Sequence, residues 1–246
     1  MKLTQTGAAI IAHRGASADA PENTLASFEL AIVQGAEWIE FDVRRSLDGI
    51  LFIHHDPNRG SAVLAKLTFE QIKDLPGGET IPTFEQLLRA VQGRVKLDIE
   101  LKEAGFEAEV VATARKFFMY DEIIVTSFLD DVLAKIKAID SNIRTGLLVG
   151  RQLNHQDPLR QLPDLFPGAR VRRIGAHFVA SHYLFGDVLY RWLLRRSGIP
   201  VVMWTIDNPS LIRRYLRDPN VVAIITNRPA VALKQKAEFD RRKAIS

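Results

Sequence analysis

The sequence predicts an α/β fold of the (β/α)8, TIM-type barrel class, with a small insertion after the third strand. Short β-branched runs alternate with longer amphipathic stretches, which is typical of parallel strands with helices outside them. The 246 residues suit such a barrel as one domain, and we expect residues 1–246 to form a single unit. Polar side chains end several of the apolar runs, as they do at the mouth of a barrel.

The expected elements follow from these alternating patterns. Strands are predicted at 8–13, 38–43, 50–55, 95–102, 123–128, 145–149, 174–179, 201–206 and 222–226. Helices are predicted at 24–34, 83–91, 106–118, 130–138, 188–197 and 209–217. A barrel of this class needs eight strands, so one of the nine is accessory, and the pattern does not say which.

Two stretches depart from regular alternation. Only about seven residues separate the second and third predicted strands, too few for a crossover helix of at least about 10–12 residues, and Asp48-Gly49 supplies a turn. Residues 57–80 have mixed polarity and contain Pro76-Gly77-Gly78. We predict that this stretch is the insertion, placed over one rim of the barrel.

The composition limits the possible functions. The chain has no cysteine, which excludes disulfides, thiolate metal sites and a cysteine nucleophile. Much of the formal charge of +4 lies in short clusters, and no basic stripe interleaved with aromatics is visible, so we expect no nucleic acid partner. No apolar run approaches the roughly 20 residues of a membrane span. We expect a cytoplasmic protein without stable membrane insertion, and the sequence does not predict its oligomeric state.

Ionisable side chains interrupt two strands that should be apolar on both faces. The period of two puts Glu40 and Asp42 on one face of the second strand, and Asp98, Glu100 and Lys102 on one face of the fourth. By itself the first pair is typical of a solvated strand face, and Glu100 with Lys102 is equally typical of a buried ion pair. Their position at corresponding strand ends favours a site.

The residue types in this group indicate a chemistry. Three carboxylates from two strands form an oxygen-rich cage suited to Mg²⁺ or Ca²⁺. His13 and His55 end two further strands and can act as general acid and base near neutral pH. Arg14 and Lys102 can hold a phosphate.

These residues belong to a longer series of short motifs that closely resembles the glycerophosphodiester phosphodiesterase family, in its short, stand-alone bacterial form. The resemblance extends from about residue 10 to residue 230. It rests on His13-Arg14-Gly15, Pro21-Glu22-Asn23-Thr24, Ser27-Phe28, Gly35-Ala36, residues 39–43, Asp48-Gly49, His55-Asp56, residues 99–102, Ser127-Phe128, residues 204–206 and residues 225–227.

The resemblance implies a (β/α)-barrel hydrolase of lipid and glycerol metabolism that cleaves small glycerophosphodiesters to glycerol 3-phosphate and an alcohol. It implies one divalent metal ion, Mg²⁺ or Ca²⁺, as the cofactor. The implied roles are metal binding for Glu40, Asp42 and Glu100, acid–base catalysis for His13 and His55, phosphate contact for Arg14 and Lys102, bracing for Glu22 and Asn23, and substrate lining for Trp204. The nucleophile, water or the substrate's own 2-hydroxyl, stays open, as does the division of acid and base roles.

Three positions depart from the family pattern. His54 precedes the matched histidine, although alternation and the neighbouring Asp56 favour His55. Asn227 stands where the family usually has aspartate, which we interpret as a change around the ligands and not among them. Residues 57–60 lack the usual threonine-rich sequence, which puts the substrate preference in doubt.

Three alternatives remain beside this interpretation. A related barrel enzyme acting on lysophospholipids would need an apolar patch at the mouth, which Phe178, Tyr183, Leu184 and Phe185 could supply, although such a run is more typical of a core. A silent phosphodiester-binding barrel would be expected to lack one of the histidines or carboxylates. A sugar-phosphate isomerase or aldolase would need a Schiff-base lysine or an enolising base, for which Lys102 is the candidate.

Overall fold

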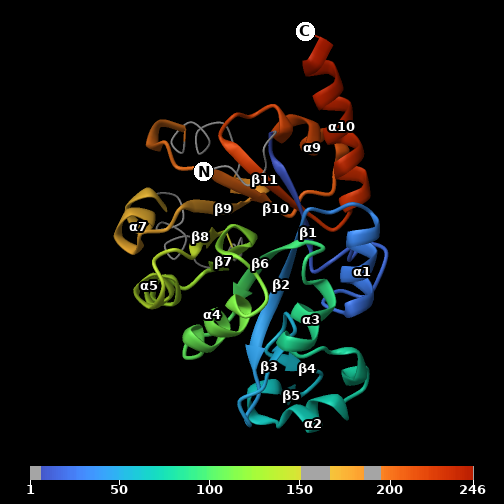
Figure 1. Cartoon of the computed structure of the whole chain (residues 1–246), viewed down its shortest axis with the longest axis vertical. Coiled ribbons are helices and arrows are strands. Elements are labelled where there is room, and N and C mark those ends of the chain that lie inside the picture. The colour runs from blue at the N-terminus through green and yellow to red at the C-terminus, as the bar shows by residue number, and fades with distance from the viewer. Residues whose placement is uncertain (1–6, 151–166, 186–194, 246) are drawn as a thin grey trace.

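The computed structural model describes residues 7–150, 167–185 and 195–245, and in them eight parallel strands close into a barrel (Figure 1). Closure is complete because the first barrel strand pairs with the last on one side and with the second on the other. This confirms the predicted fold class. The barrel strands are β1 (Ala9–His13), β2 (Trp38–Arg45), β6 (Lys96–Leu101), β7 (Ile123–Ser127), β8 (Arg144–Val149), β9 (Phe178–His182), β10 (Val201–Trp204) and β11 (Val221–Thr226).

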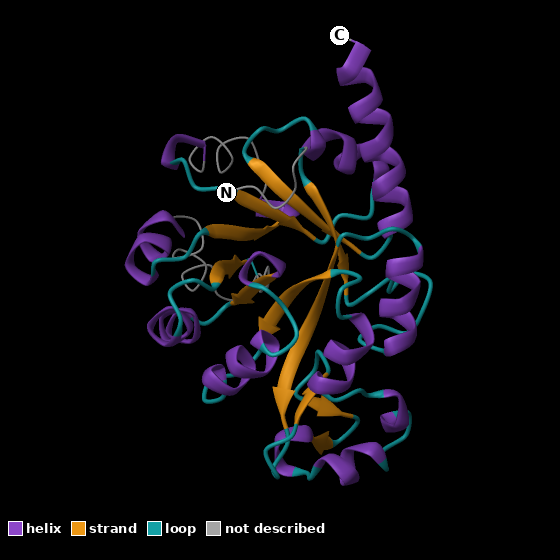
Figure 2. Cartoon of the chain, in the orientation of Figure 1, coloured by secondary structure: helices purple, strands orange, loops and turns teal. Residues whose placement is uncertain are grey.

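Helices surround the strands on the outside of the barrel (Figure 2). Several begin at a threonine whose side chain accepts from the third helical N–H, as at Thr24 and Thr83, which fixes where each helix starts. The longer helices are α1 (Leu25–Val33), α3 (Phe84–Val91), α4 (Glu107–Arg115), α5 (Asp130–Ile139), α7 (Pro167–Ile174), α9 (Pro209–Leu216) and α10 (Pro229–Ile245). Short 3-10 turns occur at η3 (Tyr120–Glu122) and η5 (Tyr183–Phe185).

The accessory strand is β3 (Leu51–Ile53), which pairs antiparallel with the end of β2. A tight turn through Ser46 and Gly49 joins them, as the short separation required. The insertion then follows β3, with its own small apolar core around Phe52 and Ile72. Its elements are β4 (Asn58–Arg59), β5 (Ala62–Val63), η1 (Leu64–Lys66), α2 (Phe69–Lys73) and η2 (Gly78–Thr80).

One predicted strand was wrong. Residues 174–179 were expected to be extended, but Ile174 ends helix α7 and the strand β9 begins only at Phe178. Gly175 separates the two elements with a φ of 68°, a left-handed conformation that glycine adopts without a steric penalty. The expected helix at 188–197 lies mostly outside the described residues.

The outward and the inward faces of the barrel strands pack into separate apolar cores. On β2, Ile39, Phe41 and Val43 point outward and pack under the helices, and the rings of Phe28 and Phe84 each lie 6.0 Å from the ring of Phe41. Inside the barrel a second cluster fills the lower part, with Trp38 and Phe178 as its largest members. The carboxyl ends of the strands therefore meet above an apolar plug, and the polar inward positions lie there.

Candidate active site

A cavity of about 250 Å³ opens at the carboxyl ends of the strands. Seven of the ten residues proposed from the sequence line it, and they come from β1, β2, β6, β10 and the loops that follow β1, β3 and β6. The predicted residues that line it are His13, Arg14, Glu40, His55, Glu100, Lys102 and Trp204. Asp42, Asn23 and Glu22 contact these lining residues from behind or from the rim.

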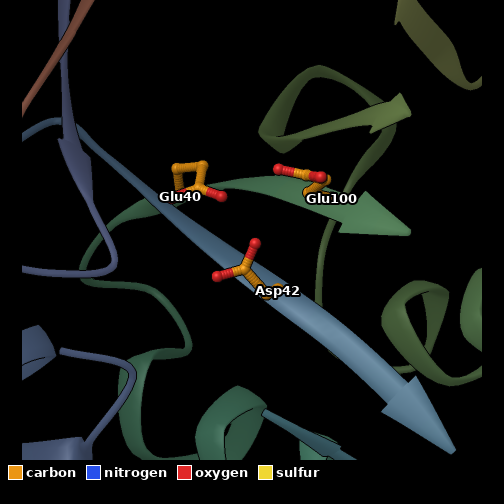
Figure 3. A group of neighbouring side chains, drawn as sticks. All are labelled: Glu40, Asp42 and Glu100. Carbon is orange, nitrogen blue, oxygen red and sulfur yellow. The ribbon is translucent and has the colours of Figure 1, made fainter. Parts of the chain in front are cut away.

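Three buried carboxylates form the centre of the site (Figure 3). Glu40 and Asp42 project from β2 and Glu100 from β6, and one oxygen of each lies within 4.8 Å of the others. Register explains the meeting, because Asp42 pairs with Glu100 across the two parallel strands. The Glu40 Oε1 atom is buried and has no hydrogen-bond partner. Such an oxygen-only cluster with an unsatisfied buried acceptor could hold a hard divalent cation.

The three carboxylates differ in their protonation. Burial, with the nearby Asp42 and Glu100 charges, raises the pKa of Glu40 well above its usual range. Burial likewise raises the pKa of Glu100 to about 7, against the opposing effect of Lys102. Burial would also raise the pKa of Asp42, but Lys102 and Arg14 together hold it below its usual range. Asp42 is therefore the member that stays ionised most readily.

Two cations flank the carboxylates. The Lys102 ammonium lies 2.6 Å from Glu100 Oε1 and 2.9 Å from Asp42 Oδ1, and its side chain is only 3% exposed. Lys102 thus forms the buried ion pair between strands that the sequence offered as one interpretation, and it also lines the cavity. The Arg14 Nε atom lies 3.2 Å from Asp42 Oδ2, and the Arg14 backbone N–H donates to Glu40 Oε2 at 2.9 Å.

The loop after β1 folds so that its polar groups face the carboxylates. Arg14 and Asn23 both have positive φ, 54° and 58°, and Gly15 between them packs too close to Ser27 for any Cβ. This conformation lets Asn23 Nδ2 donate to Asp42 Oδ2 at 2.8 Å. Glu22 lies at the rim instead, where both its oxygens accept from Arg14 Nη1 at 2.9 and 3.0 Å.

His13 ends β1 with its Nε2 facing the cavity, 3.9 Å from Glu40 Oε2. Its Nδ1 lies 2.6 Å from Asn227 Oδ1 at the end of β11. Burial, with the adjacent Arg14 charge, lowers the pKa of His13 to about 4. The imidazole is therefore neutral at pH 7 and can accept a proton.

His55, and not His54, lines the cavity. Its Nδ1 lies 2.8 Å from Asp56 Oδ1. Burial and the Lys102 charge lower the pKa of His55, and the Asp56 hydrogen bond opposes this. The buried Arg44 holds the backbone here, donating from Nε and Nη2 to the His55 carbonyl oxygen at 3.0 and 2.5 Å.

Trp204 forms one wall of the cavity. Its Nε1–H donates to the Ala180 carbonyl oxygen at 3.0 Å, and its ring meets Phe128 edge-on with the centroids 5.9 Å apart. The His182 ring lies edge-on at 4.8 Å. These contacts fix the indole as a rigid apolar surface beside the polar groups.

Several residues that contact the site were not proposed from the sequence. Asp98 lies fully buried below Glu100, where burial raises its pKa to about 8 despite the hydrogen bond from Thr126. Strand alternation placed Asp98 on the inner face, but nothing separated its role from that of Glu100. The contacts of Arg44 and of Asn227 depend on how loops approach, and no local pattern predicts them.

Known proteins are similar to this chain over most of its length. Residues 13–231 match the model of the Glycerophosphoryl diester phosphodiesterase family. The glycerophosphodiester phosphodiesterase of Caldanaerobacter subterraneus is 26% identical over 242 residues, which cover 89% of this chain and 94% of the relative. Glycerophosphodiester phosphodiesterase 1 of Mus musculus is 33% identical over 238 residues, covering 80% of this chain and 71% of the relative.

Among solved structures, an Oleispira antarctica phosphodiesterase in complex with the product sn-glycerol-3-phosphate is similar, with a TM-score of 0.77 and 26% identity. The similarity covers 96% of this chain and 99% of that one. Since the family match spans nearly the whole chain and the barrel is shared, the chain belongs to the glycerophosphoryl diester phosphodiesterase family of hydrolases.

Proposed function

We propose that this chain hydrolyses glycerophosphodiesters to glycerol 3-phosphate and an alcohol, with one divalent ion bound by Glu40, Asp42 and Glu100. The observation that carries the proposal is the meeting of this carboxylate cluster with two cations and two histidines in one cavity. The solved relative from Oleispira antarctica holds sn-glycerol-3-phosphate, the product expected here.

The residues present fit Mg²⁺ or Ca²⁺, because all the available ligand atoms are carboxylate oxygens and one of them is buried without a partner. When bound, such an ion would polarise a phosphoryl oxygen and offset the charge that collects on it. The charges also support this assignment. Once the ion has displaced the protons of Glu40 and Glu100, the three ionised carboxylates would exceed Arg14 and Lys102 by one negative charge. A divalent ion would then make the group positive and complementary to a phosphodiester monoanion.

The chain's own residues supply the remaining steps. Arg14 and Lys102 hold and orient the phosphate, since both cations line the cavity and are fixed by buried carboxylates. One imidazole takes the proton of the attacking hydroxyl or water, and the other gives a proton to the departing alkoxide. His13 and His55 both reach the cavity and both have a fixed Nδ1 partner, which orients Nε2 for this work.

Two of the alternatives have less support. A Schiff base would require a neutral Lys102, but, although burial lowers the pKa of this amine, Asp42 and Glu100 raise it more. A lysophospholipid enzyme would use an apolar patch that includes Phe178, yet Phe178 is fully buried inside the barrel and only Leu184 of that run is shown to be exposed. Phe185 lies outside the residues whose side chains are described.

We propose soluble diesters as the substrates, and the cytoplasm stays a prediction from the sequence. In the described part of the chain, no helix combines the length and the apolar character that crossing a bilayer needs.

The test is release of glycerol 3-phosphate from glycerophosphocholine, measured with Mg²⁺, Ca²⁺ or EDTA. Glu40→Gln and His13→Ala should abolish metal-dependent turnover, because they remove a proposed ligand and a proposed acid–base group. Glu109→Gln, on an exposed position of α4, is the matched control and should keep full activity. Full wild-type turnover in EDTA would contradict the metal mechanism, and turnover only on micellar lysolipid would favour the lipid alternative.

A further inference from the structure

A chain of hydrogen bonds behind His13 leads away from the cavity to a carboxylate that does not line it. His13 Nδ1 lies 2.6 Å from Asn227 Oδ1, and Asn227 Nδ2 donates to Asp207 Oδ2 at 2.7 Å. Asp207 follows β10 and Asn227 follows β11, so the chain joins three barrel strands. The Ser17 hydroxyl also donates to Asn227 Oδ1 at 2.8 Å.

The direction of every bond in this chain follows from Asp207. A carboxylate only accepts, and Asp207 also receives the Thr226 hydroxyl at 2.9 Å and the Asn227 backbone N–H at 2.8 Å. The nitrogen of the Asn227 amide must therefore face Asp207, and its oxygen must face His13. Because that oxygen only accepts, His13 Nδ1 carries the proton of the neutral ring and Nε2 keeps its lone pair.

The tautomer matters because Nε2 is the ring atom on the cavity side, 3.9 Å from Glu40 Oε2. A ring protonated at Nε2 instead would present an N–H donor to the cavity and would leave no lone pair there to take a proton. Asn227 alone cannot impose the choice, since an amide can turn either its oxygen or its nitrogen toward the ring. The Asp207 carboxylate, on the far side of Asn227 from His13, removes that freedom because it accepts only from the amide nitrogen.

We propose that Asp207 is a positioning residue that acts through Asn227 to fix the ring orientation and the Nδ1–H tautomer of His13. The inference rests on the proposed function for its consequence in catalysis. It also assigns a role to Asn227, which stands where the family usually has aspartate. In this chain Asp207 supplies the carboxylate instead, and Asn227 connects it to the His13 imidazole.

The test exchanges the two side chains. In Asp207→Asn the new amide keeps its Oδ1 as the acceptor for the Thr226 hydroxyl and the Asn227 backbone N–H. Its Nδ2 then faces Asn227, whose amide must flip and face His13 with its nitrogen. We expect kcat on glycerophosphocholine to fall by roughly 10²-fold with little change in KM. In the double variant Asp207→Asn/Asn227→Asp each donor again meets an acceptor, so kcat should return to within about threefold of wild type.

A second measurement reports on the ring directly. The ¹⁵N shifts of His13 in histidine-labelled protein at pH 7.5, assigned with His13→Ala, should indicate the Nδ1–H tautomer in wild type and in the double variant. They should indicate the Nε2–H tautomer in Asp207→Asn. Asn208→Asp, which changes charge at the next position and keeps the N-cap of α9, is the control and should behave as wild type.

A wild-type tautomer and kcat in Asp207→Asn would overturn the positioning role, as would failure of the double variant to recover a tautomer that the single variant had lost. The tautomer measurement needs no substrate. Absence of wild-type turnover on glycerophosphocholine would therefore contradict the proposed function and leave the test of Asp207 intact.

Discussion

Replacing Glu100 by glutamine should stabilise the metal-free protein at alkaline pH. Burial raises the pKa of Glu100 from 4.5 to about 7, so the folded protein holds this proton more tightly than the unfolded chain does. Folding therefore loses stability as the pH rises from 4.5 through 7, where the folded carboxyl ionises. Glutamine cannot ionise and still offers an oxygen to Lys102, so it removes this loss.

The magnitude follows from the two pKa values. At about 1.4 kcal/mol per pH unit, ionising Glu100 costs about 3 kcal/mol at pH 8, where both states are ionised. At pH 5 only the unfolded carboxyl ionises appreciably, and the cost is about 1 kcal/mol. Glu100→Gln should thus raise the free energy of unfolding by about 3 kcal/mol at pH 8 and by about 1 kcal/mol at pH 5. Glu109→Gln, on the exposed face of α4, should change neither value.

Urea unfolding in EDTA at both pH values measures the effect, and a second series in Mg²⁺ tests its origin. An ion that binds only the folded protein adds about 2.7 kcal/mol at one hundred times its Kd. Wild type should gain this stabilisation at pH 8 and Glu100→Gln should not, so the advantage of the variant should shrink or vanish. A variant less stable than wild type in EDTA at pH 8 would refute the electrostatic argument, and equal Mg²⁺ stabilisation of both proteins would refute the role of Glu100 as a ligand.

Three further substitutions test other parts of the molecule. His55→Gln should lower kcat by roughly 10²–10⁴-fold with an unchanged melting temperature, in the glycerol 3-phosphate assay; near-normal turnover would remove His55 from catalysis. Lys102→Met should destabilise the protein by about 3–5 kcal/mol in urea at pH 8, because two buried carboxylates lose their cation; an unshifted midpoint would contradict this. Gly146→Ala should cost about 1–3 kcal/mol in thermal unfolding, because its Cβ would lie 2.2 Å from the Phe178 ring, whereas Gly168→Ala meets nothing closer than 3.6 Å.

Strand alternation predicted most of the barrel, and its failures have physical causes. Residues 167–174 form a short helix in which Pro167, Val171 and Ile174 are buried at helical spacing, but three arginines lie among them and the apolar residues that start at Ile174 resemble the beginning of a strand. In the fold two of these charges are compensated from another helix, since Arg170 and Arg173 both bind Asp130 at the start of α5. Asp130, 40 residues from Arg170 in sequence, thus stabilises a short, arginine-rich helix that has few apolar residues.

The same distinction separates what could be predicted of the site from what could not. Glu40 and Asp42 point inward because side chains alternate along one strand, and the same alternation turns Glu100 inward on its own strand. The parallel register of β2 and β6 then places Glu100 beside Asp42. Asn227 meets His13 across 214 residues of sequence, and its orientation depends on the path of the chain after β10. Loop courses of this kind carry no periodic signal.

The pKa values at the barrel mouth link ion binding to proton release. In the metal-free site burial and mutual repulsion keep protons on Glu40, and in part on Glu100, while the cations keep Asp42 ionised. Asp42 is therefore the proposed ligand that is ionised before the ion arrives, and Glu40 and Glu100 become full ligands only as their protons leave. Lys102 and Arg14 hold Asp42 in this state, so the residues proposed to bind phosphate also prepare the site for the ion. Because the protons and the ion compete for the same oxygens, the affinity of the proposed site for a divalent ion must rise with pH up to and beyond about 7.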